Sequence, residues 1–220
     1  MTRLPFHDRH DAGRVLASHL AHYRAAPGLL VLALPRGGVA VAAEVAQALE
    51  APLDVFIVRK LGYPGHPEYA MGAVASGGVR VMNPGMERVP PATVDEVVEE
   101  ELAELRRRER LYRGERPPPV LAGRTVIVVD DGLATGATMK AAALAIRAQR
   151  PLRLCLAVPV GARESCEALQ DCADEVVCPF TPEPFRAVGL WYADFPQAGD
   201  DEVRTLLAAA ARRHPGGTPP

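Results

Sequence analysis

The chain has 220 residues, 48% of them hydrophobic, and its formal net charge at pH 7 is −2. That length and apolar content suit one large domain with its own core, and the small charge excludes a whole-protein attraction to nucleic acid or membranes. The charged N-terminus lacks the apolar segment of a signal peptide and no apolar run reaches membrane-spanning length, so we expect a cytoplasmic protein without a membrane partner.

The first predicted elements are a helix and then a strand–loop–helix unit. Asp8 to Arg24 has helical spacing of apolar residues, and Asp8 or Asp11 can cap its start. Leu29 to Leu34 is a continuous apolar run, which predicts a buried strand, and Ala40 to Leu49 predicts the helix after it.

The loop between this strand and helix reads PRGGV, Pro35 to Val39. Gly37 and Gly38 free the backbone to wrap an anion, and Arg36 supplies a fixed charge that suits phosphate. This pattern predicts an anion-binding loop, although a glycine turn with a surface arginine has the same letters.

Leu53 to Val58 predicts the next strand, which ends in Arg59 and Lys60. Two cations at the carboxyl end of a strand lie where open α/β sheets bind ligands. Leu61 to Glu68 contains two glycines and two prolines, so we expect a flexible lid that neither extends the strand nor starts a helix. Ser76, Gly77 and Gly78 separate two short apolar runs, Ala70–Ala75 and Val79–Met82, which predicts a hairpin.

A long charged helix follows. Thr93 and Glu96 have the spacing of a capping box, and Pro117 to Pro119 should stop the helix. Acidic residues fill its first half and arginines its second, including a run from Arg106 to Arg116. A solvated helix explains these charges, and an RNA-binding arginine face is the alternative.

The most informative stretch is VIVVDDGLATGAT, Val126 to Thr138. Its apolar start predicts a strand buried on both faces, and Met139 to Gln149 predicts a helix after the loop. Amides of such a loop and the start of the helix favour a phosphate. Asp130 and Asp131 would repel a phosphate, but they could accept hydrogen bonds from sugar hydroxyls and face a metal. The stretch therefore predicts a site for a phosphorylated sugar.

The remaining elements alternate between strand and helix, which predicts an α/β fold with a mostly parallel sheet flanked by helices. They are strands at Leu152–Val158 and Glu175–Cys178 and helices at Arg163–Leu169 and Asp200–Arg213. The segment from Phe180 to Phe195 gathers five aromatic residues in a chain that is only 5% aromatic. The four cysteines form no CxxC pair, so we expect reduced thiols; a zinc site from Cys166, Cys172 and Cys178 is the badly spaced alternative.

The thirteen residues from Val126 to Thr138 resemble the signature of type I phosphoribosyltransferases: four apolar residues, two acids, a short linker and Thr-Gly-x-Thr. The resemblance implies that Mg²⁺ is the cofactor and that phosphoribosyl pyrophosphate (PRPP) is bound by these residues: Asp130, Asp131, Ala134, Thr135, Gly136, Ala137, Thr138, Arg36, Gly37, Gly38, Arg59 and Lys60. It implies catalytic roles for Asp130, Asp131, Arg36 and Lys60. The two acids would meet the metal indirectly, through ribose or water, and Trp191, Tyr192 and Phe180 are the candidates for contact with a base.

We therefore expect one phosphoribosyltransferase-like domain over residues 1–214, with a core at about 27–180, a small hood from 1–26 and 181–213, and a flexible tail at 215–220. The implied reaction moves the phosphoribosyl group of PRPP to a nitrogenous base or related acceptor and releases pyrophosphate, in a protein expected to be a homodimer. Ala134 stands where 6-oxopurine enzymes usually carry an aspartate, which argues against those bases. Two alternatives are a PRPP-sensing regulator that binds nucleic acid with little or no catalysis, and a hydrolase or phosphorylase-like use of the same site.

Overall fold

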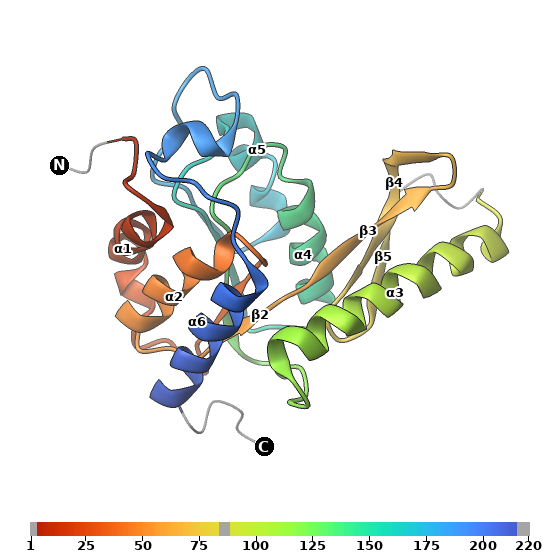
Figure 1. Cartoon of the computed structure of the whole chain (residues 1–220), viewed down its shortest axis with the longest axis horizontal. Helices are drawn as coiled ribbons and strands as arrows, with labels where there is room; N and C mark the ends of the chain where they lie inside the picture. Colours follow the sequence, from red (N-terminus) through yellow and green to blue (C-terminus); the bar gives the residue numbers. More distant parts are fainter. Residues whose placement is uncertain (1–3, 84–88, 215–220) are drawn as a thin grey trace.

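The computed structural model describes residues 4–83 and 89–214, and only the backbone of residues 67–70. Its centre is a sheet of five parallel strands in the order β2-β1-β6-β7-β8 (Figure 1). The strands are β2 (Leu53–Val55), β1 (Leu30–Ala33), β6 (Thr125–Val129), β7 (Arg153–Ala157) and β8 (Glu175–Val177). This confirms the prediction of a mostly parallel α/β sheet.

Helices cover both faces of this sheet, which explains the continuous apolar letters of its strands. Along β6, Ile127 and Val129 pack on one face with α1, α2 and α6, whereas Val126 and Val128 pack on the other with α4 and α5. The helices are α1 (Arg9–His19), α2 (Gly38–Ala48), α4 (Ala137–Ala148), α5 (Arg163–Glu167) and α6 (Asp200–Arg213). Asp8 caps α1 by accepting a hydrogen bond from the amide of Asp11, as its position predicts.

A second sheet of three antiparallel strands projects from the core with the long helix α3 along it (Figure 1). Its strands are β3 (Val58–Tyr63), β4 (His66–Ala75) and β5 (Val79–Met82), and α3 is Pro91–Arg113. The predicted hairpin is therefore present. The single strand predicted over Leu53–Val58 is wrong, because the chain passes from the parallel sheet to the antiparallel one at Phe56 and Ile57.

The predicted loop at residues 61–68 is also wrong as a description of the backbone. β3 continues through Tyr63, and Gly62 is accommodated by register shifts in its pairing with β4. Pro64 and Gly65 form the two-residue connection to β4, with Gly65 at φ +78°. Proline and glycine thus form a hairpin turn here rather than a long loop; closure of this hairpin tip over a ligand stays a prediction.

The ends of α3 differ from the capping-box prediction. The helix begins at Pro91 after an N-cap at Pro90, with no side-chain cap bond, because proline is pre-organised for the first helical turn. It ends at Arg113, followed by Gly114 at φ +65°, before the proline run is reached. Arg113 is buried and anchors α3 to the core, since its guanidinium pairs with Asp54 and donates to the carbonyl oxygen of Val55 at 2.8 Å.

The segments around Phe6 and Tyr192, which are far apart in the sequence, meet in the fold. Phe6 forms a bridge with Tyr192, and both pack into a cluster with Ala12 and Val160. Among the described residues, short 3-10 helices also lie at Ala21–Tyr23, Gln170–Cys172 and Val188–Trp191. The division into a core and a hood remains a prediction. The expected tail at 215–220 lies outside the described residues. No helix within the described ranges is long and apolar enough to cross a membrane.

Candidate active site

Two loops meet at the carboxyl edge of the central sheet. Strands β1 and β6 are parallel neighbours, with Ala33 paired to Val129, so the loops that follow them lie side by side. Helix α2 starts after the first loop and α4 after the second, and neither N-terminus is capped by a side chain of the described residues. In α2 the amides of Gly38 and Val39 donate to the carbonyl oxygens of Leu34 and Arg36, whereas no acceptor is found among the described residues for the amides of Ala137 to Met139 in α4. Helix N-termini favour anions. The structure thus brings two potential anion sites together at one edge.

Glycine allows these loops to approach each other. A Cβ on Gly37 would lie 2.0 Å from Oδ2 and 2.7 Å from Cγ of Asp131, and one on Gly38 would lie 2.7 Å from the carbonyl oxygen of Val129. Any side chain at either position would push the first loop away from the acid pair. In the second loop Gly136 adopts φ +73° as the residue before α4. The glycines chosen from the sequence are therefore required by the packing of the site.

The acid pair has a partner that the sequence did not reveal. Arg9 of α1 donates from Nε to Oδ2 of Asp131 at 2.9 Å and from Nη1 to the carbonyl oxygen of Pro196 at 2.7 Å. Its guanidinium carbon lies 3.8 Å from the ring centroid of Phe195, and Arg9 is only 9% exposed. Arg9 is therefore held from two sides while it orients one carboxylate of the pair.

The electrostatics of the pair favour a cationic or hydrogen-bonding ligand. Burial raises the pKa of Asp130, and the neighbouring Asp131 carboxylate raises it further. Burial also raises the pKa of Asp131, and the bond from Arg9 opposes that shift. Asp130 accepts only the backbone amide of Asp131, at 2.9 Å, among the hydrogen bonds found in the described chain. Its carboxylate can therefore still accept hydrogen bonds from a ligand.

The aromatic segment lies over the acid pair. Tyr192 donates its hydroxyl to the carbonyl oxygen of Asp131 at 2.5 Å, and a Cβ on Gly132 would lie 2.4 Å from a methyl group of Val188. Tyr192 is 6% exposed, so its ring supports the loop from inside the fold. Phe180 is half-buried against the ring of Phe6.

Trp191 is the third aromatic candidate for base contact. It stacks near Phe185, with ring centroids 6.2 Å apart, and its indole Nε1 is buried without a hydrogen-bond partner among the described residues. A buried donor without an acceptor is costly. Of the three aromatic candidates, Trp191 therefore has the clearest capacity to recognise an acceptor, and base contact by any of them stays a prediction.

The basic candidates lie on different elements. Arg36 precedes α2 and lies 3.8 Å from Asp200 of α6. The expectation that Arg59 and Lys60 end a strand of the parallel sheet is wrong, because both lie inside β3 of the antiparallel sheet. Arg59 donates from Nε to Glu101 at 2.6 Å. Their predicted contact with pyrophosphate remains a prediction.

Lys60 and Lys140, the chain's two lysines, line one cavity of ≈ 300 Å³ between the antiparallel sheet and α4. Ala137, the first residue of α4, lines the same cavity. Lys60 therefore faces the side of α4, the helix that follows the second anion loop. The sequence offered no sign that Lys140 would join it.

A model of the family described as "Phosphoribosyl transferase domain" matches residues 10–189. The chain belongs to the type I phosphoribosyltransferase family. A Mycobacterium tuberculosis (strain ATCC 25618 / H37Rv) protein named "Putative phosphoribosyl transferase Rv0571c" is 48% identical over 210 residues, which are 94% of this chain and 47% of that protein. The phosphoribosyltransferase chain thus spans about half the length of the curated relatives it matches.

Solved structures agree on the fold. TT1426 from Thermus thermophilus is 43% identical, with a TM-score of 0.85 over 93% of this phosphoribosyltransferase chain and 98% of the other. AQ2163 from Aquifex aeolicus, at 13% identity, has a TM-score of 0.50 over 90% of this chain and 85% of the other, a likeness of fold alone. The family and fold implied by the VIVVDDGLATGAT stretch are therefore confirmed.

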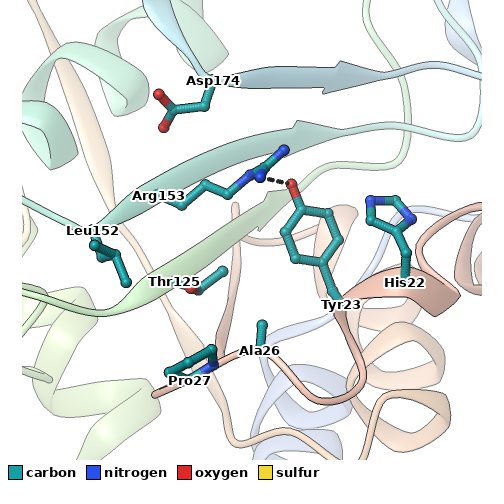
Figure 2. A pocket seen from close by; sticks show the side chains of 8 residues that line it. All are labelled: His22, Tyr23, Ala26, Pro27, Thr125, Leu152, Arg153 and Asp174. Atoms are coloured by element: carbon teal, nitrogen blue, oxygen red, sulfur yellow. Dashed lines mark hydrogen bonds between the residues drawn. The ribbon is translucent and has the colours of Figure 1, made fainter.

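The chain also has a larger cavity, of ≈ 490 Å³, away from these loops (Figure 2). Thr125 and Arg153 are the first residues of β6 and β7, so the cavity lies at the edge of the sheet opposite the acid pair. Arg153 donates from Nε to the hydroxyl of Tyr23 at 3.0 Å, and that hydroxyl donates to Glu175 at 2.5 Å. These bonds tie the 3-10 helix at Ala21–Tyr23 to β7 and β8, which is a structural role.

Proposed function

We propose that this phosphoribosyltransferase moves the phosphoribosyl group of PRPP to a nitrogen nucleophile and releases pyrophosphate. The observation that carries the proposal is the pair of uncapped helix N-termini flanking Asp130 and Asp131 at one sheet edge. PRPP has phosphate groups at both ends of a ribose that carries two free hydroxyls. Two anion sites with carboxylates between them match that order of groups.

The residues then take separate parts in the reaction. The amides around Thr135 to Thr138 hold the 5′-phosphate, and the carboxylates of Asp130 and Asp131 accept hydrogen bonds from the ribose hydroxyls. Arg36 and the backbone of Gly37 and Gly38 hold pyrophosphate and stabilise the charge that it gains as the bond at C1 breaks. The carboxylates favour the cationic sugar that forms at the same moment.

The acid pair fits a Mg²⁺ ion that arrives with its substrate. No group of three or more histidine, cysteine, aspartate or glutamate side chains within the described ranges could hold a metal by itself. Mg²⁺ typically binds through one or two carboxylates together with substrate phosphates. Asp130 and Asp131 would meet it through ribose or water, and the bound ion would supply charge neutralisation on pyrophosphate.

Two features limit the chemical identity of the acceptor. Ala134 supplies no carboxylate next to Thr135, which argues against 6-oxopurines as acceptors. The unpartnered indole N–H of Trp191 could donate to an acceptor that enters under the aromatic segment. We infer a small nitrogenous acceptor, a role in nucleotide metabolism, a cytoplasmic location and a homodimer.

The nucleic-acid-binding regulator is the weaker proposal, because three arginines of the stretch from Arg106 to Arg116 pair with carboxylates. Arg107 and Arg108 both pair with Glu104, and Arg113 is buried between Asp54 and Glu109. Binding to nucleic acid depends on basic side chains that are free to neutralise phosphates. The chain's formal net charge of −2 also gives no general attraction to a polyanion.

We expect millimolar PRPP with Mg²⁺ to raise the melting temperature, because a ligand that binds only the folded state stabilises it. Differential scanning fluorimetry measures the shift, with ribose and Mg²⁺ as the control that lacks phosphates. Pyrophosphate release across a panel of bases then tests catalysis. The absence of any shift with PRPP would contradict the proposed site, and a shift without release for any base would support a PRPP sensor.

We expect Lys60→Ala to lower turnover more than it lowers affinity for ribose 5-phosphate, which lacks pyrophosphate. The reason is that the proposed role of Lys60 is to meet pyrophosphate, whereas the 5′-phosphate belongs to the loop before α4. Steady-state kinetics and calorimetric titration with ribose 5-phosphate measure the two effects. Lys140→Ala is the matched control, because it removes the other lysine of the same cavity. Equal losses of turnover and ribose 5-phosphate affinity in Lys60→Ala would refute the assignment.

A further inference from the structure

Two thiols meet directly beneath the second anion loop. Cys166 belongs to α5 and Cys178 follows β8, and the two flank Gly161. A Cβ on Gly161 would lie 3.0 Å from Sγ of Cys166 and 3.3 Å from Sγ of Cys178. Both sulfur atoms therefore lie close to the same point, and Cys178 donates to the carbonyl oxygen of Phe180 at 3.4 Å. All four cysteines of the chain are free.

The two thiols are chemically unequal. The neighbouring Cys178 thiol lowers the pKa of Cys166 against the effect of burial, whereas the neighbouring Cys166 thiol and burial both raise the pKa of Cys178. Cys166 is therefore the better thiolate and Cys178 the better proton donor. Cys166 is 8% exposed whereas Cys178 is half-buried, so Cys178 is the more exposed residue of the pair.

We propose that Cys166 and Cys178 are a modification site at which hydrogen peroxide forms a reversible disulfide. The Cys166 thiolate attacks one peroxide oxygen, the O–O bond breaks, and hydroxide leaves as Cys166 becomes a sulfenic acid. The Cys178 sulfur then attacks the sulfenic sulfur, its proton passes to the departing hydroxyl, and water leaves. Two thiols lose two electrons, and one peroxide is reduced to two waters. Disulfides in reducing compartments are usually of this transient, sensing kind.

The thiol pair is joined to the site by backbone hydrogen bonds around Gly161. The amide of Leu133 donates to Val160 at 3.0 Å, and the amide of Ala162 donates to Leu133 at 2.8 Å. The hydroxyl of Ser165, next to Cys166, donates to the carbonyl oxygen of Ala134 at 2.5 Å. Leu133 and Ala134 immediately precede Thr135, so the segment that carries Cys166 also supports the loop proposed to hold the 5′-phosphate.

Disulfide formation shortens the separation of the two sulfur atoms to about 2 Å, well inside their contact distance. The start of α5 and the segment after β8 must then draw together across Gly161. Because Ser165 and Ala162 are bonded to Ala134 and Leu133, the second anion loop moves with them. The oxidised chain therefore binds PRPP more weakly. This weaker binding rests on the proposed function, whereas formation of the disulfide is independent of it.

The disulfide is tested by brief treatment with hydrogen peroxide, followed by alkylation and intact-mass and peptide analysis. We expect a mass loss of two hydrogen atoms, two fewer alkylated thiols and a peptide linking Cys166 to Cys178. Cys166→Ser and Cys178→Ala should each abolish the linked peptide, whereas Cys172→Ser should leave it intact. A link from Cys172, or stepwise oxygen addition without any linked peptide, would overturn the assignment. The Cys178→Ala variant, at a half-buried position, keeps the test valid if Cys166→Ser fails to fold.

The coupling is tested by the thermal shift that PRPP and Mg²⁺ cause before and after oxidation. We expect the shift to fall on oxidation, to return with dithiothreitol, and to be unaffected by peroxide in Cys178→Ala. An undiminished shift in the fully linked protein would overturn the coupling. The absence of a shift even in the reduced protein would count against the proposed function. The mass and peptide analysis would then still decide whether the disulfide forms.

Discussion

Asp130→Asn combined with Asp131→Asn is expected to lower phosphoribosyl transfer by roughly 10²–10³-fold, the size of effect seen when one group that stabilises a transition state is removed. The amides keep the shape of the carboxylates and can still accept hydrogen bonds. They lose the negative charge that favours a cationic sugar. Steady-state pyrophosphate release, normalised to folded protein, measures the loss, and wild-type turnover in the double variant would refute the proposed role of the pair.

Arg9 makes a folding control necessary for this variant. Replacing Asp131 leaves the buried guanidinium of Arg9 without its counter-charge, and breaking a buried ion pair costs about 3–5 kcal/mol. Adding Arg9→Gln to Asp131→Asn removes that stranded charge. We therefore expect this control variant to regain stability in urea titration without regaining activity. Recovery of turnover along with stability would show that the loss had been one of folding.

Gly37→Ala is expected to weaken PRPP binding by about 10-fold or more, because even a small displacement of a positioning loop is costly. The new Cβ would lie 2.0 Å from Oδ2 of Asp131, so the first anion loop and the acid pair must separate. Overpacking of this kind also costs about 1–3 kcal/mol of folding stability. Calorimetric titration with PRPP and urea unfolding measure the two effects.

A double-mutant cycle with Asp131→Ala tests whether that contact is the cause. Removing the carboxylate removes the atoms that the new methyl group would strike. We expect the two substitutions together to destabilise less than the sum of their separate effects, by about 1 kcal/mol or more. Additive effects would show that Gly37 is needed for a different reason, such as its backbone conformation.

The sequence was sufficient for the parallel sheet and for its two strand–glycine loop–helix units, because each depends on residues that are close together in the chain. Buried strands appear as apolar runs, and Gly37 and Gly136 stand beside the strands whose loops they form. Helix α6 was predicted at its observed bounds, Asp200–Arg213, since its acids and arginines match the two ends of a helix.

The errors share a physical cause, which is that tertiary contacts decided the outcome. Nothing local marks Phe56 and Ile57 as the point where one strand becomes two. Hydrogen bonds between Ile57 and Ser76, from distant parts of the chain, fix the change of sheet. The partnership of Arg9 with Asp131 joins residues 122 positions apart, so no local pattern could reveal it.

The contact of Arg9 with Phe195 and Pro196 has a consequence for synthesis. Residues are translated in chain order, and domains generally fold as units once enough chain is available. Arg9 and Asp131 both leave the ribosome before Phe195 and Pro196, which hold Arg9 in place. A chain that stops before Phe195 therefore has both loops but an acid pair whose arginine partner is unsupported. Under the proposed function, we expect such a chain to bind PRPP more weakly than the chain that contains both residues.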